Sequence, residues 1–449
     1  MKREPGFFKT VCALAIPVTL QSMLQSSFSI VDQIMIGQLG SVSVAGVGLA
    51  GKFASLFSVI VAAVGAVAGI MISQYLGQGN RTAVRRSFSV NLLLAVGIGG
   101  IFTVLCTLLP KQIMGLYTKD ADTLLAAAEY LAIMAGSFLP LAGATLFSTL
   151  LRCMEKPRLS LYASIVSALL NTGLNYVLIF GKLGVAPMGA TGAAMATVIA
   201  QCANFLLMAL LLPRQDALFA KEPGEKAVTA RLDWRQYLAM LLPILVCEGL
   251  WSLGENVYAA IYGHMGTAAS AAMTLMNPVQ GLVTGALCGL SQAAAILVGR
   301  RLGSGEFDGA YDASKRLMGY TLAGAALLSA AVVLGRGTYV SIYQVEDGVK
   351  ALTRQLMIAY ALVAPCKVLN MVLGGGILRS GGRTKYVMLI DIIGTWGFGV
   401  PLGLLAAFRW QLTIPWVYFI LSLEEGVRLA LSLALFRRRR WMRRLAAER

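Results

Sequence analysis

The chain has 449 residues, of which 57% are hydrophobic and 13% are charged, and its formal net charge is +17. A soluble domain carries roughly 25% charged residues and about half apolar ones, so the composition excludes an aqueous globular fold and makes lipid the main solvent. The Lys and Arg surplus is spread over short loops without interleaved aromatic residues, which argues against a nucleic-acid partner.

Apolar segments long enough to cross a bilayer follow one another along the whole chain. A membrane helix needs about 20 mostly apolar residues, and helices satisfy their own backbone polar groups within lipid. We therefore predict an all-α polytopic membrane protein with twelve transmembrane helices in two six-helix lobes. The predicted spans are 11–36, 48–74, 88–110, 126–152, 159–181, 190–213, 236–262, 268–298, 317–335, 350–379, 385–407 and 412–436.

The distribution of basic residues predicts the orientation of these spans. Most of the 38 Lys and Arg residues fall in the loops that share one side with both termini, and such loops are cytoplasmic by the positive-inside rule. We expect a multi-pass protein of the bacterial plasma (inner) membrane with both termini cytoplasmic. Trp441, behind the run Arg437–Arg440, is expected to anchor the tail at the lipid headgroups.

Landmarks recur at an offset of about 226 residues, which indicates an internal repeat. The repeat spans six helices, an even number, so its halves are parallel and related by a pseudo-two-fold axis along the membrane normal. We predict an N-terminal lobe (1–213), a cytoplasmic linker (214–235), a C-terminal lobe (236–436) and a basic cytoplasmic tail (437–449). The matched landmarks are Pro17 with Pro243, Gly40 with Gly266, YLGQGN (75–80) with RLGSGE (301–306), Tyr117 with Tyr343, and Arg152 with Arg379.

Polar residues inside the N-terminal spans are costly in lipid and need a reason. Gln21, Gln25 and Asp32 share one face of the first helix, and Asn171 and Asn175 share one face of the fifth. Each set either lines a water-filled cavity or forms hydrogen bonds between helices.

The C-terminal lobe carries acids at similar spacing. Glu248, Ser252 and Glu255 share a face of the seventh helix, and two carboxylates there require a proton, a metal cation or a nearby base. Lys367, with Asn370 one turn on, is the candidate base; a purely structural Glu–Lys pair is the alternative. Asp391 is less informative. Glu424, Glu425 and Arg428 can pair locally and are interpreted as structural.

Four segments resemble the multidrug and toxic compound extrusion (MATE) family: VDQIMIGQLG (31–40), LNYVLIFGKLGVAPMGATGAAMAT (174–197), LWSLGENVYAAIYGHMG (250–266) and GGGILRSGGRTK (374–385). The resemblance covers essentially the whole chain. It implies drug/proton or drug/sodium antiport of organic cations, and it implies that Asp32 contributes to the cation-coupling site of the N-terminal lobe.

The chain departs from two patterns of that family. One prokaryotic branch has a second aspartate in the fifth helix, where this chain has Asn175. Another branch joins a glutamate of the seventh helix, which Glu248 or Glu255 could supply, to an aspartate of the tenth, where this chain has Lys367 and Asn370. A built-in lysine in place of a bound sodium favours proton coupling as a hypothesis.

The resulting expectation is a cation-coupled antiporter that exports bulky organic cations by alternating access and is not an enzyme. Its coupling-ion residues are Asp32, Glu248 and Glu255, with Asp32 the candidate sodium ligand. Its cavity residues are Gln21, Gln25, Asn171, Asn175, Ser252, Lys367 and Asn370. We expect no cofactor besides the transported proton or sodium ion, and a monomer whose partners are organic cations and the lipid bilayer.

Two other classes of protein remain alternatives. A lipid-linked oligosaccharide flippase of the same superfamily would need several cavity Lys or Arg residues for its pyrophosphate, whereas only Lys52, Arg354, Lys367 and Arg428 fall inside the spans and away from their terminal residues. A membrane-embedded transferase would need a His/Asp or paired-acid signature at a membrane face, and the sequence shows none.

Overall fold

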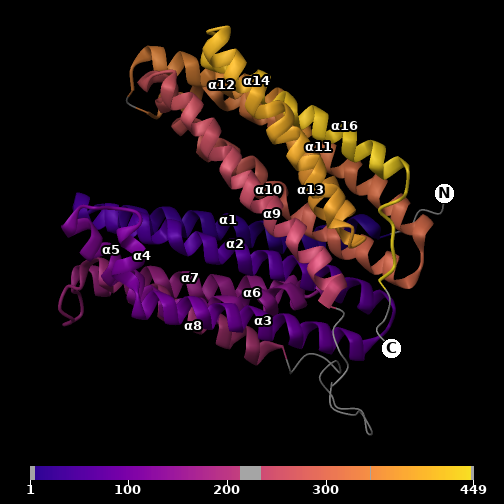
Figure 1. Cartoon of the computed structure of the whole chain (residues 1–449), viewed down its shortest axis with the longest axis horizontal. Helices are drawn as coiled ribbons and strands as arrows, with labels where there is room; N and C mark the ends of the chain where they lie inside the picture. Colours follow the sequence, from indigo (N-terminus) through magenta and orange to yellow (C-terminus); the bar gives the residue numbers. More distant parts are fainter. Residues whose placement is uncertain (1–5, 213–233, 344, 446–449) are drawn as a thin grey trace. The chain divides into compact units, whose positions relative to one another are not determined.

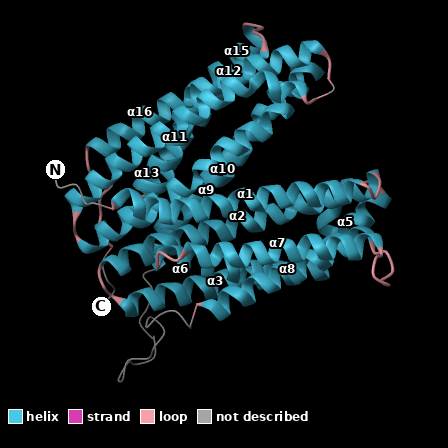
Figure 2. Cartoon of the chain, turned by 180° about the vertical axis from the view of Figure 1, so that it is seen from behind, coloured by secondary structure: helices cyan, strands magenta, loops and turns pink. Residues whose placement is uncertain are grey.

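The computed structural model describes residues 6–212, 234–343 and 345–445. In these ranges the chain forms helices joined by short turns, without a β-strand (Figure 2). They divide into two compact units. The N-terminal unit comprises residues 20–72 and 80–212, and the C-terminal unit comprises residues 6–19, 73–79, 234–343 and 345–445. The predicted linker 214–235 lies outside the described residues except for Trp234 and Arg235.

The first two helices, α1 (Phe7–Gly37) and α2 (Ser41–Gly77), contribute to both units. In the remainder of the N-terminal unit, α7 packs against α8 and α6 packs against α3 and α8 (Figure 1). Its other elements are α3 (Arg81–Leu108), α4 (Pro110–Gly115), α5 (Ala121–Met134), η1 (Ala135–Ser137), α6 (Phe138–Cys153), α7 (Pro157–Phe180) and α8 (Gly189–Leu211).

The C-terminal unit is built around α10 and α12, which pack against each other and against α11. Several of its helices continue as π-helical segments (η3, η4 and η5). The π-helix is rare in proteins, and where it occurs it is often found at a functional site. Its elements are α9 (Trp234–His264), α10 (Thr267–Ser304), α11 (Phe307–Ser341), α12 (Asp347–Asn370), η3 (Met371–Leu378), α13 (Thr384–Ile392), η4 (Ile393–Gly399), α14 (Val400–Leu404), η5 (Leu405–Arg409), α15 (Ile414–Leu421) and α16 (Leu423–Arg437).

The all-α polytopic prediction is confirmed. Eleven helices of the described chain are long and apolar enough to cross a membrane. The predicted span 412–436 differs, because its residues form two helices, α15 and α16, that meet at Ser422. Glu424, Glu425 and Arg428 lie near the start of α16, just after the break. Each of the two helices is therefore too short, and α16 too charged, to be counted as an apolar membrane span.

The C-terminal ends of α2 and α10 cross closely, and the contacts are the same when the two halves are exchanged. A Cβ added to Gly77 would overlap the backbone of Arg300, and one added to Gly303 would overlap the backbone of Gln74. Gly77 and Gly303 are repeat equivalents, as are Gln74 and Arg300. Small residues let membrane helices approach closely, so these two glycines set the crossing.

The tail contradicts one prediction. Trp441 is fully buried and its ring stacks on Phe436, with centroids 5.7 Å apart. The backbone N–H of Leu445 donates to Gln74 Oε1 at 2.7 Å, and Gln78 Nε2 donates to the Leu445 carbonyl at 2.9 Å. The expectation that Trp441 anchors at the headgroups is therefore wrong, because the aromatic stack and the α2 amides hold the tail against the C-terminal unit.

We predict that Gly303→Ala lowers the free energy of unfolding by about 1–3 kcal/mol, because the new methyl group overpacks the crossing. Thermal unfolding in detergent, followed by a thiol-reactive dye, measures the effect as a lower melting temperature. Gly319→Ala is the matched control, since a Cβ at Gly319 has no neighbour within 4 Å. Equal melting temperatures for the two variants would show that the crossing is not tight.

Candidate ion and substrate sites

In the N-terminal unit, two asparagines of α7 hold the carboxylate of Asp32. Asn175 Nδ2 donates to Asp32 Oδ1 at 2.6 Å. With its amide in the favoured orientation, Asn171 donates to both carboxylate oxygens at 3.0 and 3.1 Å. Among the described residues, no Lys or Arg forms an ion pair with Asp32. Neutral donors alone solvate this carboxylate, which leaves it free to bind a proton or a small cation.

The polar face of α1 serves more than one purpose. Gln21 Nε2 donates to Ser164 Oγ at 2.8 Å, and Ser160 Oγ donates to Gln21 Oε1 at 3.2 Å. Gln21 therefore acts as an interhelical hydrogen-bonding residue between α1 and α7, which is the alternative given to cavity lining. Gln25 is exposed.

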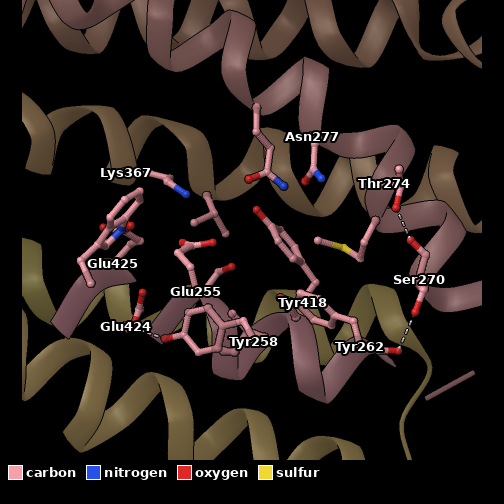
Figure 3. A pocket seen from close by; sticks show the side chains of 17 residues that line it. Glu255, Tyr258, Tyr262, Ser270, Thr274, Asn277, Lys367, Tyr418, Glu424 and Glu425 are labelled. Atoms are coloured by element: carbon pink, nitrogen blue, oxygen red, sulfur yellow. Dashed lines mark hydrogen bonds between the residues drawn. The ribbon is translucent and has the colours of Figure 1, made fainter. Parts of the chain in front are cut away.

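The C-terminal unit contains a polar pocket of about 310 Å³ between α9, α10, α12, α15 and α16 (Figure 3). Carboxylates, tyrosine hydroxyls, amides and one ammonium group share its lining with a few apolar side chains. The lining residues are Trp251, Glu255, Tyr258, Ala259, Tyr262, Ser270, Met273, Thr274, Asn277, Gln280, Val363, Lys367, Tyr418, Leu421, Ser422, Glu424 and Glu425.

Glycines in the π-helix η4 make room for the charged groups of α16. A Cβ on Gly399 would overlap the Glu424 carboxylate and the Tyr258 hydroxyl, and a Cβ on Gly394 would overlap the side chain of Arg428. The sequence IGTWGFG (393–399) thus lets α16 bring its acids and arginine close to η4. Any other residue at Gly394 or Gly399 would displace them.

One arginine neutralises two of the nearby acids. Arg428 forms ion pairs with Asp391 and, at 3.5 Å, with Glu425 Oε2. Asn370 Nδ2 also donates to Glu425 Oε2 at 2.8 Å, and Cys247 Sγ donates to Asp391 Oδ2 at 2.7 Å. The carboxylates of Asp391 and Glu425 are therefore each held by one shared cation and one neutral donor.

The other two pocket acids are less compensated. Glu424 is 7% exposed and accepts a hydrogen bond from the Tyr258 hydroxyl at 2.6 Å, a neutral donor. Glu255 makes no hydrogen bond or ion pair with any described residue. In Figure 3 its carboxylate lies within the pocket, as does the ammonium group of Lys367. The pocket therefore combines unpaired negative charge with aromatic faces, which is suitable for a cation.

The structure separates the two acids predicted on the seventh helix. Glu255 lines the pocket, whereas Glu248 pairs with Arg379, its Oε1 lying 3.3 Å from Nη1, and is not a lining residue. Lys367 lines the pocket with Glu255 and does not pair with Glu248. Ser252 is exposed and does not line the pocket.

Glu424 and Glu425 of α16 were interpreted as structural residues, and the tyrosines around them were not predicted as site residues. Glu425 does pair locally with Arg428, as expected, but Glu424 and Glu425 also line the pocket. Two adjacent acids beside a single arginine in a lipid-embedded segment were the available signal, because one arginine cannot compensate both. Tyr258 and Tyr418 carried no such signal, since isolated aromatic residues are common in membrane helices.

A helical membrane protein with two repeated halves and ionisable groups among its helices has the architecture of many membrane transporters. Comparison with protein families gives the particular group. The MatE family model matches residues 17–177 and again residues 243–405, one match in each half of the repeat. The chain belongs to the MatE family and is a multi-pass membrane transporter.

Named relatives match over nearly the full length. The multidrug resistance protein MdtK of Edwardsiella ictaluri is 26% identical over 97% of this chain and 96% of its own length. The probable multidrug resistance protein NorM of Agrobacterium fabrum is 25% identical over 93% and 91%. The crystal structure of the Vibrio cholerae MATE transporter VcmN in the bent form has the same fold, with a TM-score of 0.86, 17% identity and 97% coverage of both chains.

We predict that Arg428→Met lowers the free energy of unfolding by about 3–5 kcal/mol, because it leaves Asp391 and Glu425 without their cation. Arg439→Met is the matched control. It removes an exposed ion pair with Asp308 at 2.7 Å, and such pairs contribute about 0–1 kcal/mol. Thermal unfolding of both variants tests this. Arg428→Met should melt well below Arg439→Met, and the reverse order would contradict the assigned role of Arg428.

Proposed function

We propose that the chain is a cation-coupled antiporter that exports bulky organic cations by alternating access. The observation that carries this proposal is the pocket of the C-terminal unit, where Glu255 and Glu424 lie beside Tyr258 and Tyr418 and form no ion pair with any residue that the structure describes. Carboxylates attract a cation, and tyrosine faces favour an organic one through cation–π contact. The names of the relatives MdtK and NorM, which denote multidrug resistance, support the same substrate class.

The coupling step is proposed at Asp32. Its carboxylate is bound by the amides of Asn175 and Asn171, which stabilise the ionised form without neutralising it. A proton or a sodium ion can therefore bind when the site faces the outside and leave when it faces the cytoplasm. Binding of the driving ion and of the exported cation then alternate, so the ion gradient is converted into export.

A flippase for pyrophosphate-linked cargo is the weaker candidate. Its cavity would require clustered Lys and Arg residues to compensate several negative charges. The pocket has three carboxylates, Glu255, Glu424 and Glu425, and one ammonium group, Lys367. This charge would repel a pyrophosphate.

We predict that Asp32→Asn abolishes export, because an amide can bind neither a proton nor sodium at physiological pH. Proteoliposomes loaded with ethidium measure efflux under a pH gradient alone or a sodium gradient alone, and the gradient that drives the wild type identifies the ion. Asp122→Asn, at an exposed position in the first turn of α5, is the control and should transport normally. Undiminished efflux by Asp32→Asn would contradict the coupling role.

A further inference from the structure

Lys367 is a positive charge inside the pocket, and it forms no ion pair in the part of the chain that the structure describes. It lies in the last turn of α12, next to the π-helix η3, and is partly buried. Figure 3 shows its ammonium group directed into the pocket, toward the side where Glu255 lies. Among the described residues, no carboxylate lies within 4.0 Å of it. Its charge is therefore balanced by the pocket as a whole and not by one acid.

The titratable groups around Lys367 come from four helices. From α9 come Glu255, Tyr258 and Tyr262, from α15 comes Tyr418, from α16 come Glu424 and Glu425, and α12 itself contributes Tyr360. The lining residues of α10 that carry side-chain amides, Asn277 and Gln280, are neutral. Glu425 is already paired with Arg428. Lys367 therefore faces two carboxylates without a cation of their own, Glu255 and Glu424.

We propose that Lys367 is a resident cation which competes with the transported one, and that it releases its proton when an organic cation binds in the pocket. The inference rests on the proposed function, since it concerns the same pocket. Two cations held in one small pocket repel each other. Lysine can relieve that repulsion by giving up its proton, because an ammonium group can become a neutral amine.

The proton balance of this step is simple. An N–H bond of the Lys367 ammonium breaks, the amine keeps the electron pair, and the proton leaves the pocket through water to the bulk solvent. One monovalent organic cation then replaces one proton, so the net charge of the pocket is unchanged. When the organic cation leaves, the amine takes up a proton and restores the resident charge.

The residue thereby selects among ligands. An organic cation can displace the lysine proton because its contacts with the tyrosine rings offset the cost of removing that proton. A sodium ion would have to displace the same proton without such aromatic contacts. Lys367 therefore makes this pocket a site of proton exchange, separate from the carboxylate of Asp32 in the other unit.

Binding of tetraphenylphosphonium to the purified full chain in detergent tests the proposal. This probe has no titratable group, so any proton released comes from the protein. Asp32→Asn is used as the background, which removes the titration of Asp32. Calorimetry in two buffers of different ionisation enthalpy, from about pH 7 to 9, counts the protons released. We expect up to one proton per bound cation, and thus an affinity that rises by up to about tenfold per pH unit.

Two substitutions at Lys367 complete the experiment. Lys367→Gln removes the charge and should bind the probe more tightly, with affinity almost independent of pH in this range. Lys367→Arg keeps a charge that does not dissociate in proteins and should bind weakly without proton release. Release that persists in Lys367→Gln, or equal affinities for the Gln and Arg variants, would overturn the proposal.

The same data separate this inference from the proposed function. Binding without proton release contradicts the role of Lys367 alone and leaves organic-cation binding in place. Proton-linked binding without tetraphenylphosphonium efflux from wild-type proteoliposomes contradicts the antiport proposal alone. If neither the wild type nor the Asp32→Asn background binds the probe at any pH, both are overturned.

Discussion

The site of the C-terminal unit depends on the small number of basic side chains that pair with its carboxylates. Arg428 is shared between Asp391 of α13 and Glu425 of α16, and its pair with Asp391 joins α16 to α13. Because that arginine is already shared by two carboxylates, Glu424 has only the Tyr258 hydroxyl and Glu255 has no partner among the described residues. An ionised carboxylate without a basic partner raises the free energy of a lipid-embedded protein unless water, a proton or a cation reaches it. The pocket supplies that access.

The two halves of the repeat share a framework and differ in their chemistry. Repeat-related glycines make reciprocal close contacts where α2 and α10 cross. In contrast, the repeat position of Asp32 is occupied by Tyr258, which donates a hydrogen bond to Glu424. The acid has therefore not been retained at the equivalent place on α9, and the C-terminal unit obtains its acids from another turn of that helix and from α16. The framework is thus symmetric, and the ionisable sites are not.

Most of the fold followed from the sequence because lipid imposes length and hydropathy on every span. The sequence did not reveal the break at Ser422 within the predicted span 412–436, where α15 ends and α16 begins, since a short helix with two acids is not distinguished from a polar membrane helix by composition. The prediction failed at Trp441, because an aromatic residue beside arginines suits a headgroup anchor as well as a buried stack. The burial of the tail also depends on Gln74 and Gln78 of α2, which lie far away in the chain and are not specified by composition or spacing.

The sites were less predictable than the fold, for a related reason. The co-facial spacing of Asn171 and Asn175 correctly brought them together on α7, and the structure adds that they bind Asp32. Spacing alone also grouped Glu248 with Glu255, yet Arg379 takes the first and the pocket holds the second. Helical periodicity states which residues share a face. It does not state which helix covers each part of that face.

The central claim is that Glu255, Glu424 and the tyrosines around them form a binding site for an organic cation. Anomalous diffraction from crystals grown with tetraphenylarsonium tests it most directly, because arsenic marks the position of the positive charge. The account predicts an arsenic peak inside the pocket, between the Glu255 carboxylate and the ring of Tyr258 or Tyr418. An empty pocket in crystals that hold the cation elsewhere in the protein would contradict it.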